Sequence, residues 1–220
     1  MESIASNHLL FANNLSHKFD TLLYSEVIFC LAAHESLAIL GSSGSGKSTI
    51  LNHLSTLLPP NHGHIDMVGY KNIYTLKDKE LLFLRQKMIG IIFQSHYLFR
   101  GFNVYENLRI AEIISGLHCD MEMLECFGIN HTLKQQIGEL SGGQQQRLSI
   151  ARILTKKPQI LLADEPTGNL DRGTSANVMH YLFDYIKSQN ACLVLATHDN
   201  SLAEQCTKVM LLESKRLRVL

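Results

Sequence analysis

The sequence predicts an α/β fold, and three observations carry this prediction. Apolar runs that suit buried strands recur along the chain, at 37–40, 88–93, 159–163 and 191–196. A glycine-rich loop at 41–49 separates the first run from a segment with helical spacing. Between 95 and 158 strand patterns are missing and helical periodicity dominates, which predicts a helical insertion in an otherwise α/β chain.

The composition disfavours several classes of function. Of the 220 residues, 45% are apolar, as in an ordinary globular protein, and 20 basic side chains balance 20 acidic ones. A neutral chain offers no electrostatic reason to bind nucleic acid or a membrane surface. The first residues, Met1–Ile4, carry no basic segment before an apolar stretch, and no apolar run approaches the length of a membrane span. We expect this chain to reach a membrane only through a partner.

Cysteine and histidine provide no framework for disulfides or metal. The five cysteines include no C-x-x-C pair, which favours a reducing cytoplasm. His62 and His64 alternate around Gly63 in what the pattern indicates is a turn, without a carboxylate or cysteine at metal-site spacing. A structural metal is therefore not predicted.

The first part of the chain alternates short strands and turns. An antiparallel sheet beside the glycine loop is suggested by three predicted strands, 9–12, 27–31 and 37–40. The helix after the loop stops at Pro59 and Pro60. The spacing then predicts an edge strand, a short amphipathic helix and a buried strand that ends at Gln94, over 64–68, 78–87 and 88–93.

The second part of the chain begins with the helical insertion. Its predicted helices cover 104–115, 119–128 and 142–156. Buried strands then return at 159–163 and 191–196, with an amphipathic helix at 174–189 between them. The chain finishes with a predicted helix near 200–206 and a pair of short strands in 208–220.

The glycine loop carries the most specific chemistry in the sequence. It fits G-x-x-x-x-G-K-[ST], and its glycines let backbone N–H groups approach a phosphate at the positive end of the following helix. Lys47 reaches the β- and γ-phosphates, and Ser48 offers a hydroxyl to Mg²⁺. The candidate nucleotide-binding residues are therefore Gly41, Ser42, Gly44, Ser45, Gly46, Lys47, Ser48 and Thr49.

Polar residues follow two buried strands at their carboxyl ends, the edge where ligands bind in parallel sheets. Asp164 and Glu165 follow the strand at 159–163, and His198 follows the strand at 191–196. Two buried acids need a compensating partner. A Mg²⁺ ion for Asp164 and a water for Glu165 supply one.

A second helix start offers a further phosphate site. Ser141, Gly142 and Gly143 open the helix at 142–156, and such a start exposes N–H groups and a positive dipole end. Taken alone, the same residues predict a helix N-cap only.

These motifs, in this order, resemble the nucleotide-binding subunit of ABC transporters, and the resemblance covers nearly the whole chain. It rests on Gly41–Thr49, Gln94, the signature Leu140–Arg147, Ile160–Glu165, Asn169–Asp171 and His198. The resemblance implies a P-loop NTPase fold of ABC type, in which a mixed core sheet carries an antiparallel β subdomain and an inserted helical subdomain. It implies one domain over 1–220, with the nucleotide-binding core and β subdomain in 1–94 and 159–220 and the helical subdomain in 95–158.

The resemblance also implies a role for each site residue, with ATP and Mg²⁺ as cofactors. Glu165 acts as the general base for the attacking water. The other catalytic residues that it implies are Lys47, Gln94 and His198. The implied Mg²⁺ ligands are Ser48, Gln94 and Asp164.

Two further implications concern the two ends of the nucleotide. Phe19 matches the aromatic residue that stacks on adenine, although its local sequence favours an ordinary turn residue, and Tyr24 is a weaker candidate. At the phosphate end, a second copy of the chain contributes its signature, so that the ATP-bound state is a head-to-tail homodimer. Ser141 and Gly143 are implied to bind the γ-phosphate held by the other copy, and Gly142 and Asp171 are further implied nucleotide-binding residues.

Within the family, residues 163–171 look like the branch that contains LolD-type lipoprotein-release subunits, MacB-type efflux proteins and FtsE-type division ATPases. Two departures are visible: 144–146 is closer to MacB-type signatures, and 213–215 replaces the usual Asp-Gly turn. The resemblance implies an ATP hydrolase on the cytoplasmic side of the inner membrane that powers separate integral membrane permeases. Lipoprotein release is favoured, with division control or efflux as alternatives, and the signature disfavours a P-loop kinase or GTPase.

An aromatic cluster follows Gln94 and has two open interpretations. It comprises Tyr97, Leu98, Phe99 and Phe102. These side chains either dock a membrane partner or fill the seam between the two subdomains.

Overall fold

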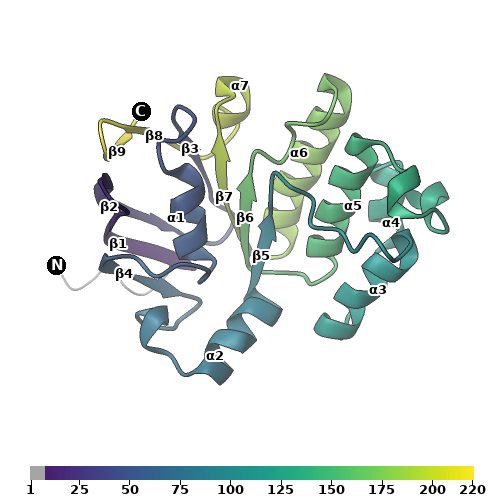
Figure 1. Ribbon diagram of the computed structural model, residues 1–220, viewed down its shortest axis with the longest axis horizontal. Helices are drawn as coiled ribbons and strands as arrows, with labels where there is room; N and C mark the ends of the chain where they lie inside the picture. The colour runs from purple at the N-terminus through teal and green to yellow at the C-terminus, as the bar shows by residue number, and fades with distance from the viewer. Residues whose placement is uncertain (1–7) are drawn as a thin grey trace.

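The computed structural model describes residues 8–220, and within them it confirms the predicted α/β class (Figure 1). The interpretation of Met1–Ile4 lies outside the described residues. Two sheets are present, a six-stranded core sheet and a three-stranded antiparallel sheet. The antiparallel sheet lies towards one end of the long axis, and the helices α3 (Val104–Ser115), α4 (Met121–Cys126) and α5 (Gly142–Leu154) lie towards the other.

The core sheet is mixed, as predicted. Its strands are parallel except for the last pair, and in spatial order they are β5 (Ile89–Ile92), β6 (Ile160–Asp164), β7 (Cys192–Thr197), β3 (Ser36–Leu40), β8 (Lys208–Glu213) and β9 (Arg216–Val219). Every residue of β3 and β7 is buried, which explains their continuous apolar sequences. Because β3, β6 and β7 are parallel to one another, their carboxyl ends meet at one edge of the sheet.

The antiparallel sheet has the order β2-β1-β4 and differs from the prediction in two ways. Its strands are β1 (Leu10–Lys18), β2 (Leu22–Leu31) and β4 (His62–Met67). The run 37–40, expected here, instead pairs with β7 and β8 in the core sheet. A strand that is apolar on both faces suits the centre of a sheet that is covered on both sides. Strand β1 of the antiparallel sheet instead alternates buried residues with more exposed ones. Strand β4 begins two residues before the predicted edge strand 64–68, so that His62 and Gly63 lie on the strand and not in a turn.

The helices largely follow the predicted periodicity. Those of the insertion are α3 (Val104–Ser115), α4 (Met121–Cys126) and α5 (Gly142–Leu154); the others are α1 (Lys47–Leu54), α2 (Asp78–Phe83), α6 (Arg172–Ser188) and α7 (Asn200–Ala203). One π-helical turn, Leu84–Met88, extends α2. Short 3-10 segments occur at Ile73–Thr75, Asn130–Thr132 and Ile137–Glu139. Between Ile92 and Ile160 the chain contains helices and loops and no strand, apart from one isolated antiparallel bridge between Asn103 and Gln136.

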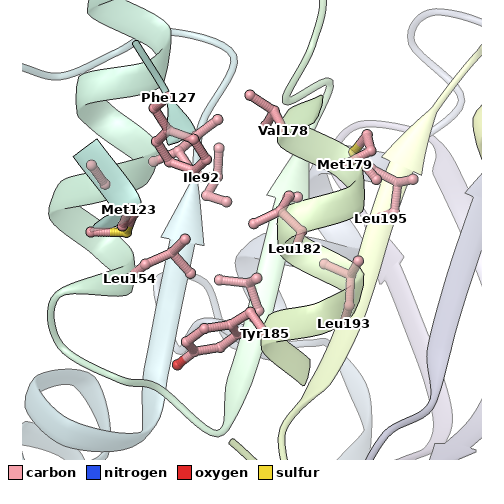
Figure 2. Packing of buried hydrophobic residues seen from close by; sticks show 14 of the residues in the cluster. Ile92, Met123, Phe127, Leu154, Val178, Met179, Leu182, Tyr185, Leu193 and Leu195 are labelled. Carbon is pink, nitrogen blue, oxygen red and sulfur yellow. The ribbon is translucent and has the colours of Figure 1, made fainter. Parts of the chain in front are cut away.

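Two apolar clusters cover the two faces of the core sheet. Because successive strand residues point to opposite faces, Leu193 and Leu195 of β7 join the helices of the insertion and α6, whereas Val194 joins α1 and the antiparallel sheet. Figure 2 shows the first cluster, which includes Leu182 and Tyr185 of α6 and Leu193 of β7. The core sheet thus packs against the insertion and α6 on one face and against α1 and the antiparallel sheet on the other.

Candidate functional site

The glycine loop joins the carboxyl end of β3 to the first turn of α1, as its sequence predicts. Gly44 and Gly46 have φ angles of 77° and 110°, a region that favours glycine. A Cβ atom on Gly46 would also lie 2.9 Å from the Leu23 side chain. Gly46 caps α1, so the N–H groups of this helix start are directed into the loop.

Lys47 lies across the loop with its ammonium group against the backbone. Its Nζ donates to the carbonyl oxygens of Gly41, at 2.7 Å, and Ser42, at 3.1 Å. The side chain is largely buried. A buried positive charge held in this way suits a phosphate group that enters the loop.

Two carboxylates at the end of β6, those of Asp164 and Glu165, line the same cleft as Lys47. Burial raises the pKa of Asp164, and the charge of Glu165 raises it further, whereas a hydrogen bond from Ser48 and the charge of Lys47 lower it. A site with two adjacent acids and a hydroxyl provides the oxygen ligands that Mg²⁺ prefers.

Glu165 is held in a specific orientation by residues at the end of β7. His198 Nδ1 lies 2.7 Å from Glu165 Oε1, and the Thr197 hydroxyl donates to Oε2 at 3.2 Å. The backbone of Glu165 has a φ of 46°, an unfavourable conformation for a residue with a side chain. The sequence indicated His198 but not Thr197; its only signal is its place directly before His198 at the end of an apolar strand.

These side chains line one cleft of about 720 Å³. Ten of the predicted site residues contribute to it: Phe19, Gly44, Gly46, Lys47, Ser48, Thr49, Gln94, Asp164, Glu165 and His198. Gly41, Ser42 and Ser45 line an adjoining cavity of about 420 Å³ that shares Leu23 and Gly44 with the cleft. Three lining residues were not predicted: Leu23, Ser43 and Gly168. Ser43 stands inside the motif at a position that accepts any residue, and no sequence signal indicates Leu23.

Four predicted nucleotide-binding residues line neither the cleft nor the adjoining cavity, both of which are described for residues 8–220. They are Ser141, Gly142, Gly143 and Asp171. Ser141 caps α5, where its hydroxyl accepts from the Gln144 N–H at 3.2 Å. Asp171 caps α6 and accepts from both the N–H and the hydroxyl of Thr174, which lower the pKa of this carboxyl. Ser141 and Gly142 are exposed, so they are accessible to a second molecule.

Tyr24 was considered a weaker candidate for stacking on a base, and this interpretation is wrong. Its side chain is fully buried in the core below the glycine loop, whereas Phe19 is 62% exposed and lines the cleft. The alternation along β2 turns Tyr24 inward, towards α1.

Two hydrogen bonds connect the segment 95–158 to the loop after Glu165, one from the signature and one from the residues after Gln94. The buried Gln146 donates from Nε2 to the Pro166 carbonyl oxygen at 2.8 Å. Asn169 Nδ2 lies 3.3 Å from His96 Nε2. Gln146 belongs to the signature motif, and its partner Pro166 lies 20 positions away in the sequence, so the motif alone does not indicate this contact.

A buried histidine predicts a pH-dependent stability. Desolvation lowers the pKa of His53 from 6.5 to about 4. Between these values the unfolded chain binds a proton that the folded chain does not, so the free energy of unfolding rises with pH in this window. We expect the full stabilisation above about pH 6.5, and a loss of roughly 3 kcal/mol as the pH falls towards 4.

Urea unfolding at pH 5 and pH 7.5 measures this effect. His53→Gln removes the titrating group, so the difference between the two pH values should shrink. His180→Gln is the matched control, because His180 is an exposed residue of α6 that pairs with Asp184. An unchanged pH difference in His53→Gln would contradict the assignment.

No helix among residues 8–220 is long and apolar enough to cross a membrane. The phosphate loop, the paired carboxylates and the histidine at the end of the neighbouring strand define a P-loop nucleotide hydrolase. Residues 24–168 match the protein family described as ABC transporter, and the chain belongs to this family. The predicted ABC-type fold and family are thereby confirmed.

Curated relatives show which members of this family the chain is similar to. A protein named "Lipoprotein-releasing system ATP-binding protein LolD" from Xanthomonas campestris pv. campestris is 36% identical over 209 residues, which cover 92% of this chain and 87% of the relative. A LolD protein from Ehrlichia chaffeensis is 39% identical over 190 residues, which cover 84% and 81%.

Solved structures agree with the sequence relatives. The ABC transporter cassette MJ0796, solved as a dimer, is 30% identical and superposes with a TM-score of 0.84, covering 94% of this chain and 96% of that one. Its post-hydrolysis state, bound to ADP and Pi, superposes with a TM-score of 0.85, also at 30% identity, covering 96% and 97%. This chain is accordingly an ATP-binding subunit of ABC type that hydrolyses ATP.

Proposed function

We propose that this chain powers separate integral membrane permease subunits in the release of lipoproteins, as a peripheral protein on the cytoplasmic side of the inner membrane. The name and the coverage of the LolD relatives support this assignment. The observation that carries the ATPase part is the contact between Glu165 and His198, 2.7 Å long, in the cleft that the phosphate loop also lines.

In this proposal Glu165 accepts a proton from the attacking water. His198 and Thr197 hold the carboxylate in place through both of its oxygens, so that its orientation is fixed before ATP enters. Lys47 binds the β- and γ-phosphates, and Gln94 senses the γ-phosphate from the end of β5.

The cleft also suits Mg²⁺. The donors Ser48, Gln94 and Asp164 all carry oxygen atoms, and Asp164 is a partly buried acid beside a second acid, where a cation offsets the repulsion. When bound, Mg²⁺ supplies positive charge to the phosphates. Ser48 and Asp164 already face one another, so binding needs little rearrangement of these two residues.

We propose that two copies form a head-to-tail homodimer when ATP is bound. Phe19 stacks on the adenine within one copy, and the second copy contributes Ser141, Gly142, Gly143 and Asp171. The exposure of Ser141 and Gly142 outside the cleft supports this arrangement, as does the dimeric form of the solved relative. The division into a core (1–94 and 159–220) and a moving helical subdomain (95–158) belongs to the same proposal.

The aromatic cluster after Gln94 is the proposed docking site for the permease. Phe99 and Phe102 are 49% and 42% exposed and Tyr97 is 67% exposed, whereas Leu98 packs against the core. The Arg152 guanidinium lies 5.5 Å from the Phe99 ring centroid and donates to the Tyr97 carbonyl oxygen. The loop is therefore held from α5 while its aromatic side chains face outward.

Replacing both Phe99 and Phe102 with serine should separate docking from ATP binding. We expect the isolated subunit to fold and bind ATP normally, because exposed rings contribute little to the core. Co-purification with the membrane subunits and their stimulation of ATP hydrolysis should fall. Val219→Ser, which changes an exposed residue of β9, is the control. Normal coupling in the folded double variant would place the docking site elsewhere.

Purification of the tagged chain with its membrane partners, followed by ATP-driven release of a lipoprotein from vesicles, tests the proposal. Permeases with large extracytoplasmic domains and ATP-dependent release are expected. A single small membrane partner without release would instead indicate FtsE-type division control, and export of a soluble compound would indicate MacB-type efflux.

A further inference from the structure

A row of aromatic rings leads from the nucleotide cleft into the protein. Phe19 follows β1 and lines the cleft, and His17, two residues earlier on β1, is only 4% exposed. The ring centroids of His17 and Phe19 are 4.7 Å apart with an interplanar angle of 76°. Such an edge-to-face contact brings the positive edge of one ring to the negative face of the other, which favours a defined orientation.

His17 is itself held by a second buried histidine. His53 lies in the last turn of α1, with its ring centroid 4.8 Å from that of His17 and 6.1 Å from that of Tyr24. Its Nδ1 lies 2.6 Å from the Leu58 carbonyl oxygen, and because a carbonyl only accepts, Nδ1 carries the proton. The row Phe19, His17, His53 is thus anchored on α1, the helix whose first turn belongs to the phosphate loop.

The imidazoles of this row make few conventional interactions. Among residues 8–220, neither ring nitrogen of His17 enters a hydrogen bond, and Nε2 of His53 finds no partner there either. Burial lowers the pKa of both histidines, which favours the neutral form of each ring. Buried polar groups without partners cost stability. For His17, the contacts with the rings of Phe19 and His53 are the interactions that offset this cost.

We propose that His17 is a positioning residue for nucleotide binding, which fixes the ring of Phe19 at the mouth of the cleft. An exposed phenylalanine after a strand would otherwise lose rotamer freedom on stacking against a base. Fixing the ring beforehand reduces this cost and strengthens binding of the base, but not of the phosphates. The inference rests on the stacking role of Phe19 in the proposed function.

The test uses the absence of tryptophan from the sequence. Phe19→Trp places a single fluorophore at the base site, and its emission should change when ATP binds. In this background, His17→Leu, which fills a similar volume without a ring, should raise the dissociation constant for ATP about threefold to tenfold. Binding of inorganic triphosphate, measured by calorimetry, should stay within twofold. His17→Phe, which restores a ring, should recover most of the ATP affinity.

His64→Ala is the matched control, because His64 contacts Phe11 edge-on at 6.3 Å outside the cleft. Equal losses of affinity for ATP and inorganic triphosphate in His17→Leu would overturn the inference, since the residue would then act on the whole loop. Unchanged ATP affinity, or no recovery in His17→Phe, would also overturn it. If calorimetry shows that ATP binds to the Phe19→Trp chain but the tryptophan emission does not change, the stacking role itself fails, and the inference fails with it.

Discussion

Glu165→Gln should reduce ATP hydrolysis by at least about a hundredfold while ATP binding persists, because a general base typically contributes that factor or more. The amide has nearly the same shape as the carboxylate and can still contact His198 and Thr197, but it cannot accept a proton from water. Lys47 and the glycine loop are unaltered. The variant should therefore accumulate as an ATP-bound dimer.

Three measurements check this result: phosphate release, ATP affinity and the molecular mass in the presence of ATP. Glu204→Gln, an exposed carboxylate that follows α7, serves as the control for loss of charge. Turnover at the wild-type rate in Glu165→Gln would remove this residue from the role of base.

Ser141→Arg should abolish both dimerisation and hydrolysis but leave ATP binding by the monomer intact. Ser141 lies outside the cleft that contains Lys47, so an arginine there does not obstruct the nucleotide of its own chain. In the proposed dimer the same position faces the γ-phosphate of the other copy, where the larger side chain prevents closure. Size-exclusion chromatography with ATP and nucleotide binding to the monomer measure the two effects separately.

A mixture of variants sharpens this test. Lys47→Ala loses phosphate binding in its own cleft but keeps its signature. Mixed with Ser141→Arg, it should restore at most one competent site per dimer, formed by the intact loop of one copy and the intact signature of the other. Neither variant alone should hydrolyse ATP. Loss of ATP binding in monomeric Ser141→Arg would count against the arrangement.

Ser141→Arg also removes the cap of α5, which costs about 1 kcal/mol of stability. Asp120→Ala removes the equivalent cap from α4, where the Asp120 carboxylate accepts from the Glu122 N–H at 2.9 Å. This control should lose comparable thermal stability and still dimerise. Failure of both variants to dimerise would attribute the effect to helix stability instead of the interface.

Local sequence was sufficient for those elements whose limits are set by neighbouring residues. The helix predicted over 104–115 has these bounds in the structure, because Asn103 and Glu106 form a capping box at its start and Gly116 adopts a left-handed φ of 73° at its end. The phosphate loop was equally predictable, since the backbone conformation at Gly44 and Gly46 requires glycine.

The predictions were least accurate where residues distant in sequence decide the structure. Strand 37–40 was expected in the antiparallel sheet, and only its pairing with β7 and β8 places it in the core sheet. Strands β1 and β2 extend further than their apolar runs, because pairing with each other continues through polar positions. The sequence of a strand does not by itself identify the strands with which it pairs.

By itself, the sequence determined the chemistry of this protein: the glycine loop, the acids after one apolar strand and the histidine after another each need specific residue types at fixed local spacing. Only the tertiary structure decided which of them meet. It brought Thr197 and His198 to Glu165 and placed Leu23 and Gly168 in the cleft. It also buried Tyr24 in the core and brought the ring of His17 into contact with that of Phe19. The physical reason is that such contacts depend on the order of the strands in the sheet, which follows from burying apolar surface on both of its faces.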